Sequence, residues 1–209
     1  MYDAFENALQ ILILVISITI ALSLAFKTHE KVWILLSMFY GCWLLGDLYW
    51  QLCLMLFGDI PQLSLVSNLS WYASYIFLYI LLRHVEPPRL DAPRRFMPFI
   101  GPIFTLGMAV FFIAQSGGEQ IVSNLISALI MGFLLYAAIV RLMEHRRAGR
   151  KGYLYILILA LIIFEYGMWI STSFAIEDNL MHPYYWCDTL LSISFLLYIP
   201  VLRREGEHS

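Results

Sequence analysis

Seven long apolar stretches constrain the fold of this chain more than any other feature of its sequence. They span residues 8–26, 33–57, 62–83, 97–115, 121–143, 153–175 and 184–202. A helix needs about 20 mainly apolar residues to cross the hydrocarbon core of a bilayer. None of the stretches alternates apolar with polar residues as the strands of a membrane barrel do. The sequence therefore predicts an all-α polytopic membrane protein, in which residues 1–209 form a single domain of seven transmembrane helices.

The composition favours a lipid environment over water. Of the 209 residues, 61% are hydrophobic and 13% are charged, whereas soluble domains are about half apolar and a quarter charged. The net charge is −2, and the basic residues are confined to the ends of the apolar stretches. We therefore expect the lipid bilayer as a partner and no nucleic acid.

The basic residues predict the orientation of the chain. All thirteen lie in alternate connections or at the C-terminal end: Lys27, Lys31, Arg83, Arg89, Arg94, Arg95, Arg141, Arg146, Arg147, Arg150, Lys151, Arg203 and Arg204. The other connections carry only acids, namely Asp59, Glu119, Glu177 and Asp178. Because Lys and Arg accumulate on the cytoplasmic side, we expect a multi-pass protein of the inner cell membrane with its N-terminus outside and its C-terminus in the cytoplasm.

Helices two and three resemble helices six and seven in sequence. A shift of 119 residues places Trp50 on Trp169, and a shift of 120 residues places Asn68 on Asp188. Parallel repeats of this kind occur in transporter folds. Two interpretations are open: a three-plus-one-plus-three duplication with the fourth stretch as the connector, or coincidence between two aromatic, apolar segments.

Three acids, Asp47, Glu165 and Asp188, lie within the predicted membrane helices. An ionisable residue there costs about 2.5–3.5 kcal/mol on insertion scales, so it normally faces the bundle interior. Helical spacing places each acid on a stripe with aromatic or hydroxyl side chains, and the rise of about 1.5 Å per residue places the stripes in the outer half. The expected ligand-binding residues of this outward-facing pocket are Asp47, Trp50, Asn68, Trp71, Tyr72, Glu165, Trp169, Tyr185 and Asp188, with Trp186 as a further wall residue.

No basic residue lies deep in any predicted helix to pair with these acids. Some are therefore protonated, or a small molecule or cation from the outer side completes the site. Acids beside tryptophan and tyrosine suit an organic ammonium group, which is attracted by both charge and cation–π interaction. The alternative is structural: Asp47–Asn68 and Glu165–Asp188 would be interhelical hydrogen bonds worth about 0.6–2 kcal/mol each.

No catalytic residue, metal site or cofactor is predicted. His182 has no second histidine nearby, and no nucleophile–base pair is apparent. Cys53 and Cys187 both fall near the outer side. They are expected either as two small buried residues or as a disulfide.

The segment at 43–50, WLLGDLYW, is followed by Pro61 and by SNLSWY at 67–72. It resembles the seven-helix membrane input modules of some bacterial sensory proteins, which precede a diguanylate cyclase or phosphodiesterase domain. Here Asn68 replaces the aspartate of helix three, and no output domain follows Arg204. The resemblance implies a sensor of a ligand or of the membrane state whose output passes to a separate cytoplasmic protein.

These observations favour a receptor-like or sensory membrane module over an enzyme. The second interpretation is a small transporter with the three-plus-one-plus-three plan of the SWEET and PQ-loop families. The Pro61-Gln62 pair resembles the proline–glutamine pair of the PQ-loop transporters. The third is an intramembrane lipid hydrolase.

Overall fold

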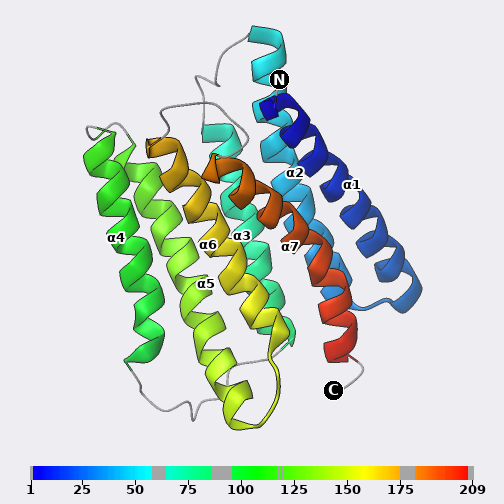
Figure 1. The fold of residues 1–209 in the computed structure, drawn as a ribbon. Helices are drawn as coiled ribbons and strands as arrows, with labels where there is room; N and C mark the ends of the chain where they lie inside the picture. The colour runs from blue at the N-terminus through cyan, green and yellow to red at the C-terminus, as the bar shows by residue number, and fades with distance from the viewer. Residues whose placement is uncertain are drawn as a thin grey trace.

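The computed structural model of the chain is a bundle of long α-helices (Figure 1). The structure describes residues 2–57, 65–85, 96–116, 118, 120–174 and 182–206. The helices are α1 (Tyr2–Thr28), α2 (Lys31–Phe57), α3 (Leu65–Val85), α4 (Ile100–Gln115), α5 (Ile121–Arg147), α6 (Tyr153–Phe174) and α7 (Pro183–Gly206), with a 3₁₀ turn, η1 (Met97–Phe99), before α4. Within these ranges there is no β-strand, so the prediction of an all-α fold is confirmed.

Six of the helices are long and apolar enough to cross a membrane: α1, α2, α4 with η1, α5, α6 and α7. The remaining helix, α3, has 21 residues, but its first half carries Ser67, Asn68, Ser70 and Ser74 among aromatic residues. These polar side chains lower the mean hydropathy of α3. The helical, apolar character supports a membrane protein.

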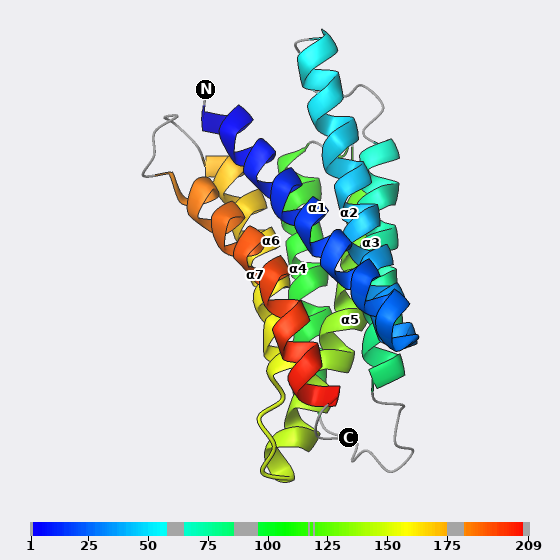
Figure 2. The same ribbon diagram turned by 90° about the vertical axis from the view of Figure 1, so that its right-hand side faces the viewer.

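Six helices form a closed cycle, and α4 lies outside it. The packed pairs are α1–α2, α2–α3, α3–α5, α5–α6, α6–α7 and α7–α1, while α4 packs chiefly on α5. Figure 1 shows α4 at one edge of the bundle and α1 at the other, and Figure 2 shows α1 crossing in front of the bundle. The chain termini lie at opposite ends of the bundle (Figure 1).

The two ends of the bundle differ in charge. The described basic residues lie where α1, α3, α5 and α7 end or where α2 and α6 begin: Lys27, Lys31, Arg83, Arg141, Arg146, Arg147, Arg150, Lys151, Arg203 and Arg204. Arg141 forms an ion pair with Glu144 there at 2.7 Å. Between α5 and α6, Gly149 and Gly152 adopt positive φ angles of 71° and 56°, which only glycine adopts without strain.

The apolar core fills the half of the bundle that carries the basic residues. Its fully buried side chains come from six helices and include Leu14, Leu36, Phe39, Leu78, Leu82, Leu134, Leu161 and Phe195. Aromatic rings pack edge to face within it, for example Phe39 with Tyr198 at 5.6 Å between centroids. This core closes the bundle at that end.

Several residues used in the sequence analysis lie outside the described residues. They are the acids Asp59, Glu119, Glu177 and Asp178, the arginines Arg89, Arg94 and Arg95, and the pair Pro61-Gln62. What the sequence analysis predicts for these residues therefore stays a prediction.

A close approach between α4 and α5 depends on Gly101. A Cβ atom added there would lie 2.7 Å from Leu135 Cβ and 3.3 Å from the backbone nitrogen of Tyr136. Neither atom can rotate away, because one belongs to the backbone and the other is attached directly to it. Gly107, on the same helix, has no such neighbour within 4 Å.

We therefore expect Gly101→Ala to destabilise the protein and Gly107→Ala not to. Overpacking costs about 1–3 kcal/mol, which exceeds the gain of about 1 kcal/mol from replacing a helical glycine by alanine. The thermal unfolding midpoint of each variant in detergent is the measurement. Equal midpoints for the two variants would contradict the close contact.

Candidate functional site

A cavity of about 640 Å³ lies inside the bundle at the end where α1 begins. Every helix contributes lining residues, and each contribution comes from that same end, for example Gln10 of α1 and Phe112 of α4. The lining continues to exposed residues such as Gln120 and Thr172, so the cavity opens at that end. Its volume falls within the range of small-molecule sites, about 300–1,000 Å³.

Three carboxyl groups line the cavity: Asp47 from α2, Glu165 from α6 and Asp188 from α7, here called the acid floor. Glu165 and Asp188 are only 3% and 4% exposed. The three groups are close enough to interact electrostatically with one another. Among the described residues that line the cavity, none is Lys, Arg or His. The cavity therefore gathers three acids without a basic partner among the described lining residues.

Part of the hydrogen-bonding capacity of this site is unused. Asp47 Oδ2 is buried without a hydrogen-bond partner in the described part of the chain, and the Tyr75 hydroxyl and Glu165 Oε2, which lie near each other, form no hydrogen bond of good geometry. The Tyr75 hydroxyl interacts electrostatically with Glu165. Each buried unsatisfied group costs about 1–3 kcal/mol. A bound proton, water or ligand would recover that free energy.

Gly46 positions the partner of Asp47. The indole Nε1–H of Trp71 donates to Asp47 Oδ1 at 3.1 Å. A Cβ atom on Gly46 would lie 2.5 Å from Trp71 Nε1, so the indole reaches the carboxylate only because residue 46 has no side chain. The Gly46-Asp47 sequence thus holds an aromatic ring from α3 against an acid from α2.

Aromatic rings wall the cavity above and around the acid floor. Trp50 lies 6.1 Å from Trp71 between ring centroids, and Phe112 lies 6.0 Å from Trp169. Trp43 contacts Tyr75 at 5.4 Å and belongs to both the cavity lining and the apolar core. Such rings attract cations that approach their faces.

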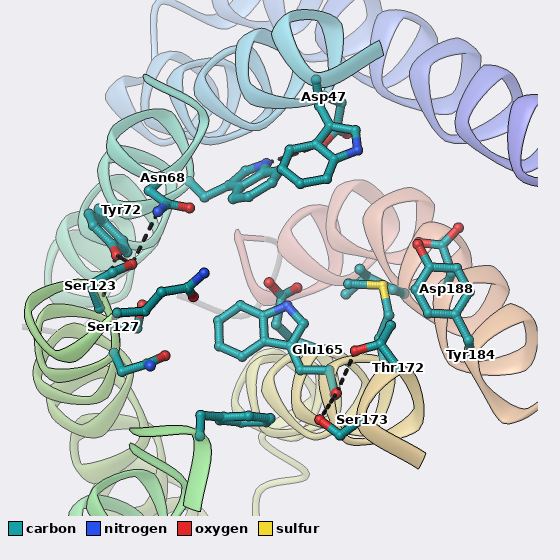
Figure 3. A pocket seen from close by; sticks show the side chains of 18 of the residues that line it. Asp47, Asn68, Tyr72, Ser123, Ser127, Glu165, Thr172, Ser173, Tyr184 and Asp188 are labelled. Atoms are coloured by element: carbon teal, nitrogen blue, oxygen red, sulfur yellow. Dashed lines mark hydrogen bonds between the residues drawn. The ribbon is translucent and has the colours of Figure 1, made fainter. Parts of the chain in front are cut away.

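A second, neutral wall is formed by α3 and α5. Asn68 Nδ2 donates to Ser123 Oγ at 3.1 Å, and the Tyr72 hydroxyl lies 2.7 Å from the same oxygen and 2.9 Å from the Ser123 carbonyl oxygen. Figure 3 shows Asn68, Tyr72, Ser123 and Ser127 together on one side of the cavity, with Asp188 and Tyr184 on the other. The cavity therefore has an acidic side and an amide and hydroxyl side.

Of the nine residues predicted to bind a ligand, eight line this one cavity: Asp47, Trp50, Asn68, Trp71, Tyr72, Glu165, Trp169 and Asp188. Tyr185 does not line it, and the neighbouring Tyr184 does. Tyr184 and Asp188 are one helical turn apart, as i and i+4, and share a face more closely than Tyr185 and Asp188 do. Trp186, expected in the wall, is 60% exposed and is absent from the lining.

The Asp47–Asn68 hydrogen bond of the structural alternative is not formed: Trp71 donates to Asp47, and Asn68 donates to Ser123. The cysteines are free thiols, so the disulfide interpretation is wrong. Cys187 Sγ lies 2.9 Å from where a Cβ of Gly167 would be. The described residues include no group of three or more His, Cys, Asp or Glu side chains arranged to hold a metal ion.

Sequence reasoning missed the contributions of α1, α4 and α5, which include Asn7, Gln10, Phe112, Gln115, Ser123, Asn124 and Ser127. The signal in α5 is a short polar stripe, because Ser123 and Ser127 are one turn apart in an otherwise apolar helix.

The chain matches no protein family, no curated protein and no solved structure at a significant level.

The Trp71–Asp47 hydrogen bond predicts the outcome of a double-mutant cycle. Trp71→Phe removes the one hydrogen-bond donor to the Asp47 carboxylate among the described residues, so we expect it to lower the free energy of unfolding by about 1–3 kcal/mol. In an Asp47→Ala background the same change should cost less, because no acceptor remains. Thermal unfolding in detergent measures both. Trp186→Phe is the control, and additive effects of the two changes would contradict the hydrogen bond.

Proposed function

We propose that this protein is a receptor-like membrane module that binds an organic cation in the cavity. The observation that carries the proposal is one cavity whose described lining has no Lys, Arg or His and which gathers the buried acids Glu165 and Asp188 with Asp47, whose Oδ2 is also buried. Burial without a counter-charge costs free energy, and a cation between these groups would offset it. The surrounding tryptophan and tyrosine rings favour an ammonium group over a hydrated metal ion.

The proposal includes seven membrane spans. α3 is less apolar than the others because its polar side chains, such as Asn68, face the cavity and not lipid. A helix of 21 residues is about 30 Å long at 1.5 Å per residue, which matches the hydrocarbon thickness. α3 also packs between α2 and α5, and both of these are long and apolar enough to span.

The orientation proposed is N-terminus outside, in an inner cell membrane. The basic residues that the structure describes gather at the closed end of the bundle, opposite the cavity. Since basic residues favour the cytoplasmic side, the cavity would open to the exterior. A ligand would then arrive from outside, and the output would pass from the cytoplasmic end to a separate protein, as the resemblance to bacterial sensory input modules implies.

A small transporter is the second candidate, and the packing cycle favours it. If α1, α2 and α3 correspond to α5, α6 and α7, each packed pair should have a packed counterpart. This is so: α1–α2 corresponds to α5–α6, α2–α3 to α6–α7, and α3–α5 to α7–α1. α4 falls outside the cycle. This arrangement supports a three-plus-one-plus-three duplication, the plan of several transporters. The dense apolar core beneath the cavity favours the receptor.

Binding of n-pentyltrimethylammonium to the purified protein in detergent tests the proposal. We expect saturable binding by calorimetry, with Asp47→Asn and Glu165→Gln each weakening it by about tenfold or more, because each removes a charge that contacts the cation. Glu30→Gln is the matched control, since Glu30 is exposed at the opposite end of the bundle.

Unchanged affinity in both cavity variants would refute a cation site in this cavity. If the bound cation also accumulates in proteoliposomes, the transporter replaces the receptor as the function.

The orientation predicts opposite labelling of two exposed positions. In a cysteine-free background, Thr172→Cys lies at the cavity end and Lys151→Cys at the basic end. A membrane-impermeant maleimide added to intact bacterial cells should label Thr172→Cys alone, while permeabilised cells should show labelling of both. The reverse pattern in intact cells would invert the proposed topology.

A further inference from the structure

The cavity is larger than the cationic group that the acid floor would hold. Its volume of about 640 Å³ suits a molecule with several more heavy atoms than a trimethylammonium group. The cavity has room for the remainder of the ligand between the acid floor and the wall formed by α3 and α5. That wall decides which chemistry the second end of the ligand carries.

The facing wall is polar but uncharged. Asn68 and Ser123 bond each other, and Tyr72 bonds Ser123. Asn124 and Ser127 also line the cavity; we call Asn68, Ser123, Asn124 and Ser127 the amide wall. Figure 3 shows its labelled members across the cavity from Asp188, with Glu165 between the two sides.

Two members of the amide wall have hydrogen-bonding groups to spare. The Asn68–Ser123–Tyr72 network holds Asn68 and Ser123 in place, whereas the side chains of Asn124 and Ser127 form no hydrogen bond to another described residue. Ser127 is nevertheless buried. A buried amide or hydroxyl that faces an alkyl chain loses its hydrogen bonds to water without replacement. A ligand that carries a hydroxyl or carbonyl group would replace them.

A carboxylate does not suit this wall. The three acids interact with one another across the same cavity, and the described lining offers no Lys, Arg or His to neutralise a further negative charge. We infer that the ligand is an organic cation whose other end is a neutral hydrogen-bonding group, such as an alcohol, ester or amide, bound by Asn124 and Ser127. This inference rests on the proposed cation site and names the ligand class for it.

Three probes of similar length separate the possibilities. Acetylcholine carries an ester, n-pentyltrimethylammonium replaces that ester with methylene groups, and 4-(trimethylammonio)butanoate carries a carboxylate. We expect acetylcholine to bind about tenfold more tightly than the pentyl compound, the value of one or two neutral hydrogen bonds. The butanoate should bind more weakly than either. Calorimetry on the full chain in detergent measures all three.

Variants of the amide wall should remove the preference for acetylcholine over n-pentyltrimethylammonium, but both compounds should still bind. In Asn124→Leu/Ser127→Ala, acetylcholine should fall to the affinity of the pentyl compound, whose own affinity should change less than about twofold. Ser70→Ala is the control, because Ser70 bonds the Val66 carbonyl oxygen on α3 and does not line the cavity.

Equal affinities for acetylcholine and the pentyl compound in the unaltered protein would overturn the inference while leaving the cation site intact. The inference would also be overturned if the amide-wall variant lost affinity for both probes by the same factor. If neither ammonium probe binds, the cation site fails and this inference fails with it.

Discussion

The structure depends on three carboxyl groups enclosed in an apolar bundle, in a cavity whose described lining contains no Lys, Arg or His. Asp47, Glu165 and Asp188 come from three helices and line one cavity. In a dry core their mutual repulsion and lost hydration would each cost several kcal/mol. A cavity that opens to a polar medium lowers this cost, so the requirement of these acids for polar surroundings accounts for a cavity at this position.

The same requirement explains the division of the bundle into two halves. Towards the end where α1 begins, side chains are polar or aromatic and leave a cavity, whereas the other half is filled by leucine and phenylalanine. Trp43 lies at the boundary, because it lines the cavity and also contacts Phe195 of the core at 4.9 Å. A change at the cavity is therefore connected by direct packing to α7, whose end carries Arg203 and Arg204.

The sequence predicted the helices and the acids well, because both depend on local signals. Long apolar runs identify helices, and an acid within such a run is conspicuous. The amide wall was not predicted, because serine and asparagine near a helix end are common and carry no charge. Tyr185 was chosen over Tyr184 because spacing alone cannot separate two neighbouring residues that both lie near the face of Asp188. The partner of Asp47 depended on the tertiary approach of Trp71 to Gly46.

The proposed duplication accounts for the backbone arrangement but not for the chemistry of the site, and the difference is informative. The shift that superposes Trp50 on Trp169 places Gly46 on Glu165, and the shift for the following helices places Trp71 on Leu191. In one half a residue without a side chain admits a large indole, and in the other half a glutamate and a leucine stand at the aligned positions. Both Trp71 and Leu191 line the cavity. Under the proposed duplication, equivalent positions of the two halves carry different side chains, and the site between them is asymmetric. An asymmetric site distinguishes the two ends of its ligand, which a symmetric one could not do.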